Sequence, residues 1–190
     1  MSNTDQYDKG PEVTTAFNRW AIPVKWGILA GLFSVILTTV NFMFIIGNYP
    51  FFLATSFVIY VVVILFYFFA GVQQRRAFGG YISLKEAFRT IFIVILISGL
   101  ISTVYGILYV KLIDPGVMDT IKESTMAFLE RVGTPPEKID ETVEAFDREA
   151  ARGMQPARLL YAFAQQIIVQ SIFGFICAFI VKRKRPVFPV

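Results

Sequence analysis

The sequence predicts an all-α polytopic membrane protein with four transmembrane helices and a helical hairpin between the third and the fourth. Two observations predict this fold class. Four long apolar runs contain no Asp, Glu, Lys, Arg or His, and each reaches the roughly 20 residues that a helix needs to cross about 30 Å of hydrocarbon. The alternating pattern of a membrane β-barrel is absent, so helices must satisfy the backbone inside the bilayer.

The four runs divide the 190 residues into one membrane domain and one extramembrane element. Gly47–Pro50 supplies a tight turn between the first two runs, which therefore form an antiparallel pair. The first run is expected to remain as an uncleaved anchor, because a small-residue cleavage site does not follow it. The expected organisation is a cytoplasmic tail at 1–25, transmembrane helices at 26–46 and 51–72, a cytoplasmic loop at 73–87, a third span at 88–110, an extracytoplasmic acidic hairpin at 111–157, a fourth span at 158–181 and a basic cytoplasmic tail at 182–190.

Positive charge indicates the orientation of these spans. The two tails and the second loop together carry eleven Lys and Arg residues and four acids, whereas the third connection carries seven basic and ten acidic residues. Since Lys and Arg favour the cytoplasmic side, both termini are predicted to be cytoplasmic. The basic ending Lys182–Arg185 is a candidate contact for anionic lipids. The basic balance is a topology signal, so no nucleic-acid partner is expected.

The third connection carries two amphipathic helical patterns separated by Gly133. Their apolar stripes need to be buried against something. They can pack on each other as a hairpin, on the membrane surface, or on a protein partner, and the second stripe (Ile139, Val143 and Phe146) then supplies partner contacts. The second pattern also has an acidic surface, formed by Glu137, Asp140, Glu141, Glu144 and Asp147.

Small and polar residues recur at helical spacing inside three of the runs. Because apolar residues cannot drive helix association in lipid, such stripes mark the faces where helices meet. An alternative is a small polar cavity near the outer leaflet that binds a ligand and is lined by Asn41, Tyr105, Gln165, Gln166 and Gln170. The second run has few polar residues and is expected to face lipid or a partner. The predicted helix-packing seam comprises Gly27, Gly31, Ser34, Thr38 and Asn41 in the first run, Ser98, Ser102 and Gly106 in the third, and Gln166, Gln170 and Gly174 in the fourth.

Ionisable residues are missing where membrane chemistry needs them. The chain has no His, a single cysteine (Cys177), and no charge in any run. Proton-coupled transport and intramembrane catalysis place ionisable groups within the spans, and metal sites need clustered ligands. The sequence therefore predicts no catalytic residue, no metal, no cofactor and no enzymatic activity.

Three segments carry a resemblance to a known family. They are Gly79–Phe88 before the third span, with Ser83 and Glu86 at the spacing of a capping box, Tyr109–Pro115 after it, and the ending Lys182–Pro186. Together with a tryptophan-bearing N-terminal segment and the acidic loop, they make the chain similar to the DUF4199 family over nearly its whole length. The resemblance implies a small four-span protein of the bacterial inner membrane in Bacteroidota, and it implies no activity or site.

Two functions are compatible with these features. The first is a non-enzymatic accessory or structural subunit of a membrane complex, or a homo-oligomer, which acts through helix packing and the acidic hairpin. The alternative is a carrier or binder of a neutral or lipidic small molecule. A ligand retained in native mass spectrometry would favour the second function, and a stoichiometric companion protein would favour the first.

Overall fold

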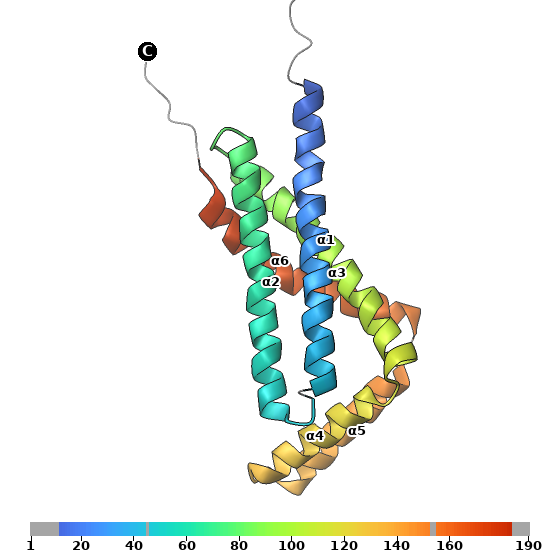
Figure 1. Cartoon of the computed structure of the whole chain (residues 1–190). Coiled ribbons are helices and arrows are strands. Elements are labelled where there is room, and N and C mark those ends of the chain that lie inside the picture. Colours follow the sequence, from blue (N-terminus) through green and yellow to red (C-terminus); the bar gives the residue numbers. More distant parts are fainter. Residues whose placement is uncertain (1–11, 45, 153–154, 184–190) are drawn as a thin grey trace, which may run out of the picture.

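The computed structural model describes residues 12–44, 46–152 and 155–183, and these residues are almost entirely helical. Most of the two predicted tails, at 1–11 and 184–190, lies outside the described residues. In chain order the elements are α1 (Glu12–Phe44), α2 (Tyr49–Ala77), α3 (Leu84–Leu108), the π-helical turn η1 (Tyr109–Ile113), α4 (Val117–Arg131), α5 (Pro136–Arg152) and α6 (Pro156–Val181) (Figure 1).

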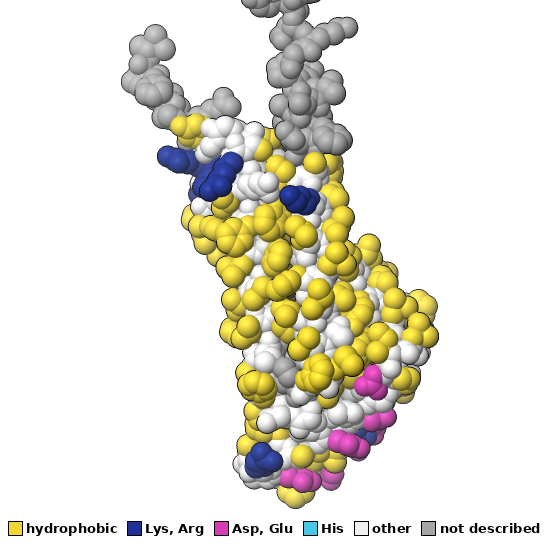
Figure 2. All heavy atoms as spheres, viewed as in Figure 1, with side chains coloured by type: hydrophobic (Ala, Val, Ile, Leu, Met, Phe, Trp, Pro, Cys, Tyr) yellow, Lys and Arg dark blue, Asp and Glu magenta, His cyan; other side chains and the backbone are white. Residues whose placement is uncertain are grey.

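Four of the helical segments are long and apolar enough to cross a membrane, as predicted. Both ends of the described chain lie at one end of the bundle, which we call the tail end, while α4 and α5 lie at the other, the hairpin end (Figure 1). Figure 2 shows a wide hydrophobic belt between the two ends, with acidic side chains gathered at the hairpin end. The candidate spans are Trp20–Phe44, Tyr49–Ala77, Leu84–Ile113 and Pro156–Val181.

Local signals explain most helix boundaries. The Ser83 hydroxyl accepts from the Glu86 N–H, and the Glu86 carboxylate accepts from the Ser83 N–H, so the predicted capping box begins α3. Asn48 caps α2 through its side-chain oxygen. Gly133 adopts φ +75° between α4 and α5, a conformation in which a Cβ would be strained. The first helix differs from the expectation, because it begins at Glu12 rather than near residue 26.

Helix α3 is the centre of the bundle and packs against α1, α2 and α6. Glycines let it approach its neighbours closely. A Cβ added at Gly27 or Gly31 of α1 would come within 2.8 Å of Ile97 or Ile101 side-chain atoms of α3. A Cβ at Gly174 of α6 would come within 2.7 Å of Ile95. These distances are shorter than a van der Waals contact. The helices therefore approach each other closely at positions where glycine has no side chain.

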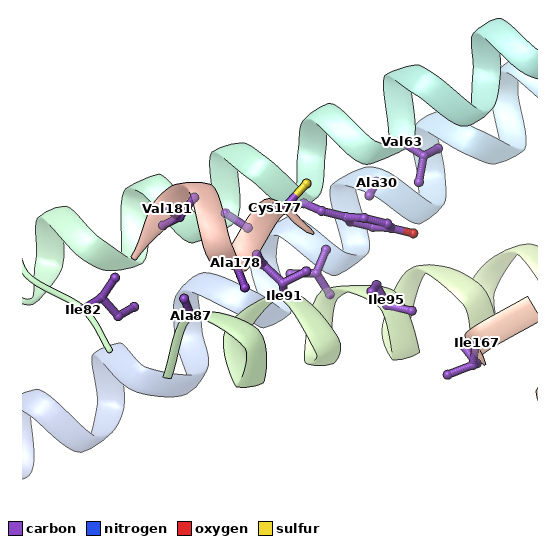
Figure 3. Close-up of a cluster of buried hydrophobic side chains, with 13 residues drawn as sticks. Ala30, Val63, Ile82, Ala87, Ile91, Ile95, Ile167, Cys177, Ala178 and Val181 are labelled. Carbon is purple, nitrogen blue, oxygen red and sulfur yellow. The ribbon is translucent and has the colours of Figure 1, made fainter. Parts of the chain in front are cut away.

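The apolar core lies toward the tail end of the bundle. It is built from buried side chains of all four long helices, and Figure 3 shows how those of α2, α3 and α6 converge on one another. Cys177 belongs to this cluster as a buried free thiol. The cluster comprises Ala30, Val63, Tyr67, Ala70, Ile82, Ala87, Ile91, Val94, Ile95, Ile167, Cys177, Ala178 and Val181.

Backbone contacts fasten the end of α6 to the α2–α3 loop. Ile82 and Arg183 exchange two backbone hydrogen bonds, each of 3.0 Å between nitrogen and oxygen. The Arg75 guanidinium also donates to the carbonyl oxygen of Val181 (3.1 Å). The loop before α3 and the end of α6 are thus joined at the tail end of the bundle.

The hairpin formed by α4 and α5 packs against the start of α2. Helices α4 and α5 pack against each other, with Ile139 and Thr125 buried between them and an ion pair from Lys122 to Asp147 across them. The Phe128 ring of α4 contacts the Tyr49 ring at the start of α2, with 5.5 Å between centroids. A helical hairpin between the third and fourth spans is therefore present, and its assignment to the outer side of the membrane stays a prediction.

Candidate functional site in the helix bundle

A cavity of about 340 Å³, lined by both polar and apolar side chains, lies between the four long helices. It extends from the middle of the bundle toward the hairpin end. Eleven of its lining residues are polar and none is charged. The lining consists of Ser34, Thr38, Asn41 and Phe42 from α1, Phe52, Ser56, Ile59, Tyr60, Val63, Ile64 and Tyr67 from α2, Ser98, Gly99, Ser102 and Thr103 from α3, and Gln166 and Gln170 from α6.

At its hairpin end, the cavity is bordered by an amide held between two hydroxyls. The Asn41 side-chain amide donates to Ser56 Oγ (2.8 Å), and its carbonyl oxygen accepts from Thr55 Oγ1 (2.6 Å). Asn41 is buried. Both partners lie on α2, so this cluster joins the two helices of the first hairpin and fixes one wall of the cavity.

At its deep end, the cavity is closed by a tyrosine and a glutamine. The Tyr67 hydroxyl of α2 donates to Gln170 Oε1 of α6 (2.8 Å), and both residues are buried. The Tyr60 hydroxyl neighbours the same glutamine, and Ser98 neighbours Tyr67. A buried polar group is costly unless it is hydrogen-bonded, so this contact holds α2 and α6 in register.

Longer hydrogen bonds complete the other walls. Ser102 Oγ donates to Ser34 Oγ (3.3 Å) between α3 and α1, and Thr103 Oγ1 donates to Gln166 Oε1 (3.4 Å) between α3 and α6. Gln170 is engaged by both Tyr67 and Tyr60, whereas the described side chains offer no acceptor for the amide nitrogen of Gln166. The cavity therefore presents the Gln166 amide as a donor to whatever occupies it.

The chemistry of the lining suits binding. Amides, hydroxyls and aromatic rings supply hydrogen bonds and contact area, and the lining residues have no carboxylate, imidazole or ammonium group to transfer a proton. In the described part of the chain no group of His, Cys, Asp and Glu could hold a metal. An uncharged molecule that carries hydrogen-bond acceptors matches these walls.

The comparisons with known proteins concern the same elements. A model of the family described as "Protein of unknown function (DUF4199)" matches residues 25–183. The chain belongs to the DUF4199 family. The match covers the membrane bundle and the hairpin together, and it confirms the predicted resemblance. No curated protein and no solved structure matches the chain.

The structure of this DUF4199 protein places the predicted seam residues in two groups, with Gly106 in neither. Gly27, Gly31 and Gly174 lie at close helix approaches, whereas Gly106 has nothing within 4 Å of an added Cβ. The remaining residues of the seam line the cavity: Ser34, Thr38, Asn41, Ser98, Ser102, Gln166 and Gln170. The packing stripe and a polar cavity were alternatives from the sequence, and in the structure these seven residues belong to both.

The other predicted contact residues lie elsewhere. Tyr105 is outside the cavity lining, and its hydroxyl bonds to Thr39 Oγ1. Gln165 is exposed on α6 and does not line the cavity. In the hairpin Ile139 is buried, while Val143 and Phe146 are partly buried.

The second helix contributes more to this site in the DUF4199 protein than its sequence suggests. It was expected to face lipid or a partner, and one of its faces is indeed exposed, but the other forms a full wall of the cavity. Ser56, Tyr60 and Tyr67 are spaced by four and seven residues, which places them on one face of a helix. That spacing was the available signal, and the abundance of Phe, Val and Ile around it obscured it.

Proposed function

We propose that this DUF4199 protein binds a small uncharged amphipathic molecule within the membrane and acts as a binding protein rather than as an enzyme. The cavity carries the proposal. Its volume of about 340 Å³ falls in the range of small-molecule sites, and its walls combine aromatic surface with a few amides and hydroxyls, as such sites do.

Two physical arguments support a neutral ligand. Charged groups in a membrane interior are expensive and are accompanied by countercharges, and the cavity offers none. A polar group without a partner is also costly to leave facing hydrocarbon, so the Gln166 amide donor favours an occupant with acceptor atoms, either water or a ligand. A ligand with ester, ketone or hydroxyl oxygens would accept from this amide.

The test uses a matched pair of glutamines. Protein purified in mild detergent is examined by native mass spectrometry for a retained small molecule, and Gln166→Leu is compared with Gln165→Leu, its exposed neighbour outside the cavity. We expect retention to fall for Gln166→Leu and to persist for Gln165→Leu. Equal retention in both variants, or no retained molecule in the parent protein, would contradict the proposal.

The second candidate is an accessory subunit or homo-oligomer that docks through the hairpin. It is favoured by the placement of the acids of α5, because Glu137, Asp140, Glu141, Glu144 and Asp147 are all exposed while the apolar residue Ile139 faces α4. A basic protein surface would complement such a helix.

A mild-detergent pull-down followed by mass spectrometry tests this candidate. We expect a stoichiometric companion, or a defined oligomer, that is lost when Glu141 and Glu144 are both replaced by Lys. Glu123→Lys on α4 serves as the control. A monodisperse monomer without companion would argue against docking and would leave binding in the cavity as the remaining function.

The cellular setting is part of the same proposal. The protein resides in a bacterial inner membrane of the Bacteroidota with both termini in the cytoplasm, so the hairpin is extracytoplasmic. The charge distribution of the sequence supports this orientation. Basic residues near the tail end, including Arg76 and Arg183, are exposed and would contact anionic lipid head groups there.

A further inference from the structure

The described ring contacts and hydrogen bonds between the side chains of α2 and α6 begin at Tyr60, near the middle of α2, and continue toward the tail end. Tyr60 meets Phe173 with 6.2 Å between ring centroids, and Tyr67, two turns nearer the tail end on α2, bonds to Gln170. Still nearer the tail end, Gly71 meets Val181. Helix α2 before Tyr60 makes its side-chain contacts with α1 and α4 instead, through Asn41 and Phe128. The two helices therefore diverge toward the hairpin end, as Figure 1 shows.

Residues on the facing sides of the two diverging helices are uncovered. Leu53 and Phe57 precede Tyr60 by seven and three residues, which places them on the face of α2 that meets α6, yet they are 47% and 71% exposed. On α6, Val169 and Ala162 precede Phe173 by one and three turns and are also exposed. These four apolar residues flank the region where the two helices diverge, and we take the space between them as the gap through which the cavity would open toward the hydrocarbon.

The end of the cavity that faces the hairpin is covered by aromatic rings. Phe42 of α1 lies between Phe52 of α2 and Tyr109 of η1, with centroid separations of 6.0 and 5.1 Å. Both phenylalanines belong to the cavity lining. Beyond them, the contact between Tyr49 and Phe128 seats α4 on the start of α2. These rings therefore cover the cavity on the side that faces the hairpin and water.

We propose that the occupant of the cavity is an uncharged lipid that enters sideways, from the hairpin half of the bilayer, through the gap between α2 and α6. Its head, with ester or ketone oxygens, accepts a hydrogen bond from the Gln166 amide. Its hydrocarbon tail stays in the gap beside Phe57 and Val169. This inference rests on the proposed function and adds the class of ligand and its route.

The experiment uses two photoactivatable probes on the full chain in liposomes. One is a diacylglycerol with a diazirine in an acyl chain, and the other is a short-chain, water-soluble glycerol diester with the same diazirine. Cross-linked residues are located by peptide mass spectrometry and normalised to labelling at Ile168, an exposed residue of α6. We expect the long-chain probe to label the cavity-facing positions Ser56 and Tyr60, and the soluble probe to label them weakly.

Two tryptophan substitutions on α6 form a matched pair, one at the gap and one on another face of the helix. Ala162→Trp adds an indole on the face of α6 toward α2, whereas Ala164→Trp adds it about 200° around the same helix, where the side chain is also exposed. We expect Ala162→Trp to reduce labelling of the cavity by the lipid probe several-fold and Ala164→Trp to leave it unchanged. Circular dichroism and thermal unfolding confirm that both variants fold.

The outcomes separate the route from the function. If the soluble probe labels the cavity as strongly as the lipid, and Ala162→Trp has no effect, sideways access by a lipid is wrong while binding in the cavity stands. If neither probe labels the cavity and Gln166→Leu retains as much endogenous ligand as the parent protein, the proposed function fails as well.

Discussion

Individual glycines in this protein differ in what a side chain at their position would meet. At Gly31 a new Cβ would lie 2.8 Å from the Ile101 side chain, and at Gly106 it would meet nothing within 4 Å. Overpacking a tight contact forces the neighbour or the backbone to move. The same substitution should therefore have opposite effects at these two positions.

We expect Gly31→Ala to lower the free energy of unfolding by about 1–3 kcal/mol through overpacking. Gly106→Ala should be neutral or stabilising by up to about 1 kcal/mol, because alanine favours a helix more than glycine does. Unfolding in mixed micelles of increasing SDS fraction measures both. The double variant Gly31→Ala, Ile101→Ala should recover part of the loss. Equal effects at the two glycines would show that the α1–α3 contact is looser than the distances indicate.

Gln74 presents the reverse situation, a polar group without a partner. Its side chain is 1% exposed, and its Oε1 is the buried side-chain atom for which the described residues supply no hydrogen-bond donor. An unsatisfied buried acceptor costs about 1–3 kcal/mol. We expect Gln74→Met, which keeps the length of the side chain, to raise the midpoint of thermal unfolding. A lowered midpoint would mean that an ordered water or lipid group satisfies this oxygen.

The helices show which parts of the fold a sequence can predict. Spans, turns and caps depend on residues that are neighbours in the chain, so the four runs, the two hairpin helices and the Ser83 capping box could be predicted. The cavity wall on α2 depends on which face of that helix meets α1, α3 and α6. Tyr67 and Gln170 are 103 residues apart, and no local pattern joins them.

The π-helical turn η1 is a second feature that local pattern did not predict. The third span was predicted to end at residue 110, and the helical segment formed by α3 and η1 continues to Ile113. Its last residues widen to a π turn, however, and Tyr109 in that turn is buried against Phe42. That ring contact lies between α1 and η1, so it depends on tertiary packing rather than on local sequence.

The seam residues were found because small and polar side chains are rare enough in a span to stand out, whereas their role as a cavity lining needed the structure.

The capping box of α3 allows a prediction at the scale of one element. Ser83→Ala removes the acceptor for the Glu86 N–H and should cost about 1 kcal/mol of stability, as is usual for an N-cap. Lys85→Ala is the control, because this exposed side chain in the same turn makes no hydrogen bond or ion pair with the residues that the structure describes. Both are measured by the same SDS titration. A loss of similar size for Lys85→Ala would assign the effect to surface charge instead.

At the scale of the whole molecule, the chain crosses the apolar belt four times and brings both described ends to one side. The hairpin and the α2–α3 loop therefore lie on opposite faces of any membrane that contains the bundle. This arrangement makes a single labelling experiment decisive for orientation.

We expect a cysteine at position 141 (Glu141→Cys) to react with a membrane-impermeant maleimide on cells whose outer membrane is permeabilised. A cysteine at position 85 (Lys85→Cys) should react only after lysis, because basic loops stay in the cytoplasm. The background carries Cys177→Ala, which removes the single native thiol from a buried site. The reverse pattern would invert the proposed topology and would place the gap between α2 and α6 in the cytoplasmic leaflet.

The backbone bridge between Ile82 and Arg183 determines where the chain can be truncated and where another protein can be fused to it. A chain that stops before Arg183 loses both bonds of the bridge, and the end of α6 is then released from the loop. An affinity tag or fluorescent protein fused to the C-terminus would be attached on the side of the tail end, far from the gap between α2 and α6. Ligand capture, vesicle reconstitution and surface immobilisation can therefore use a C-terminal fusion, whereas an insertion in the hairpin would stand beside the gap that a lipid has to pass.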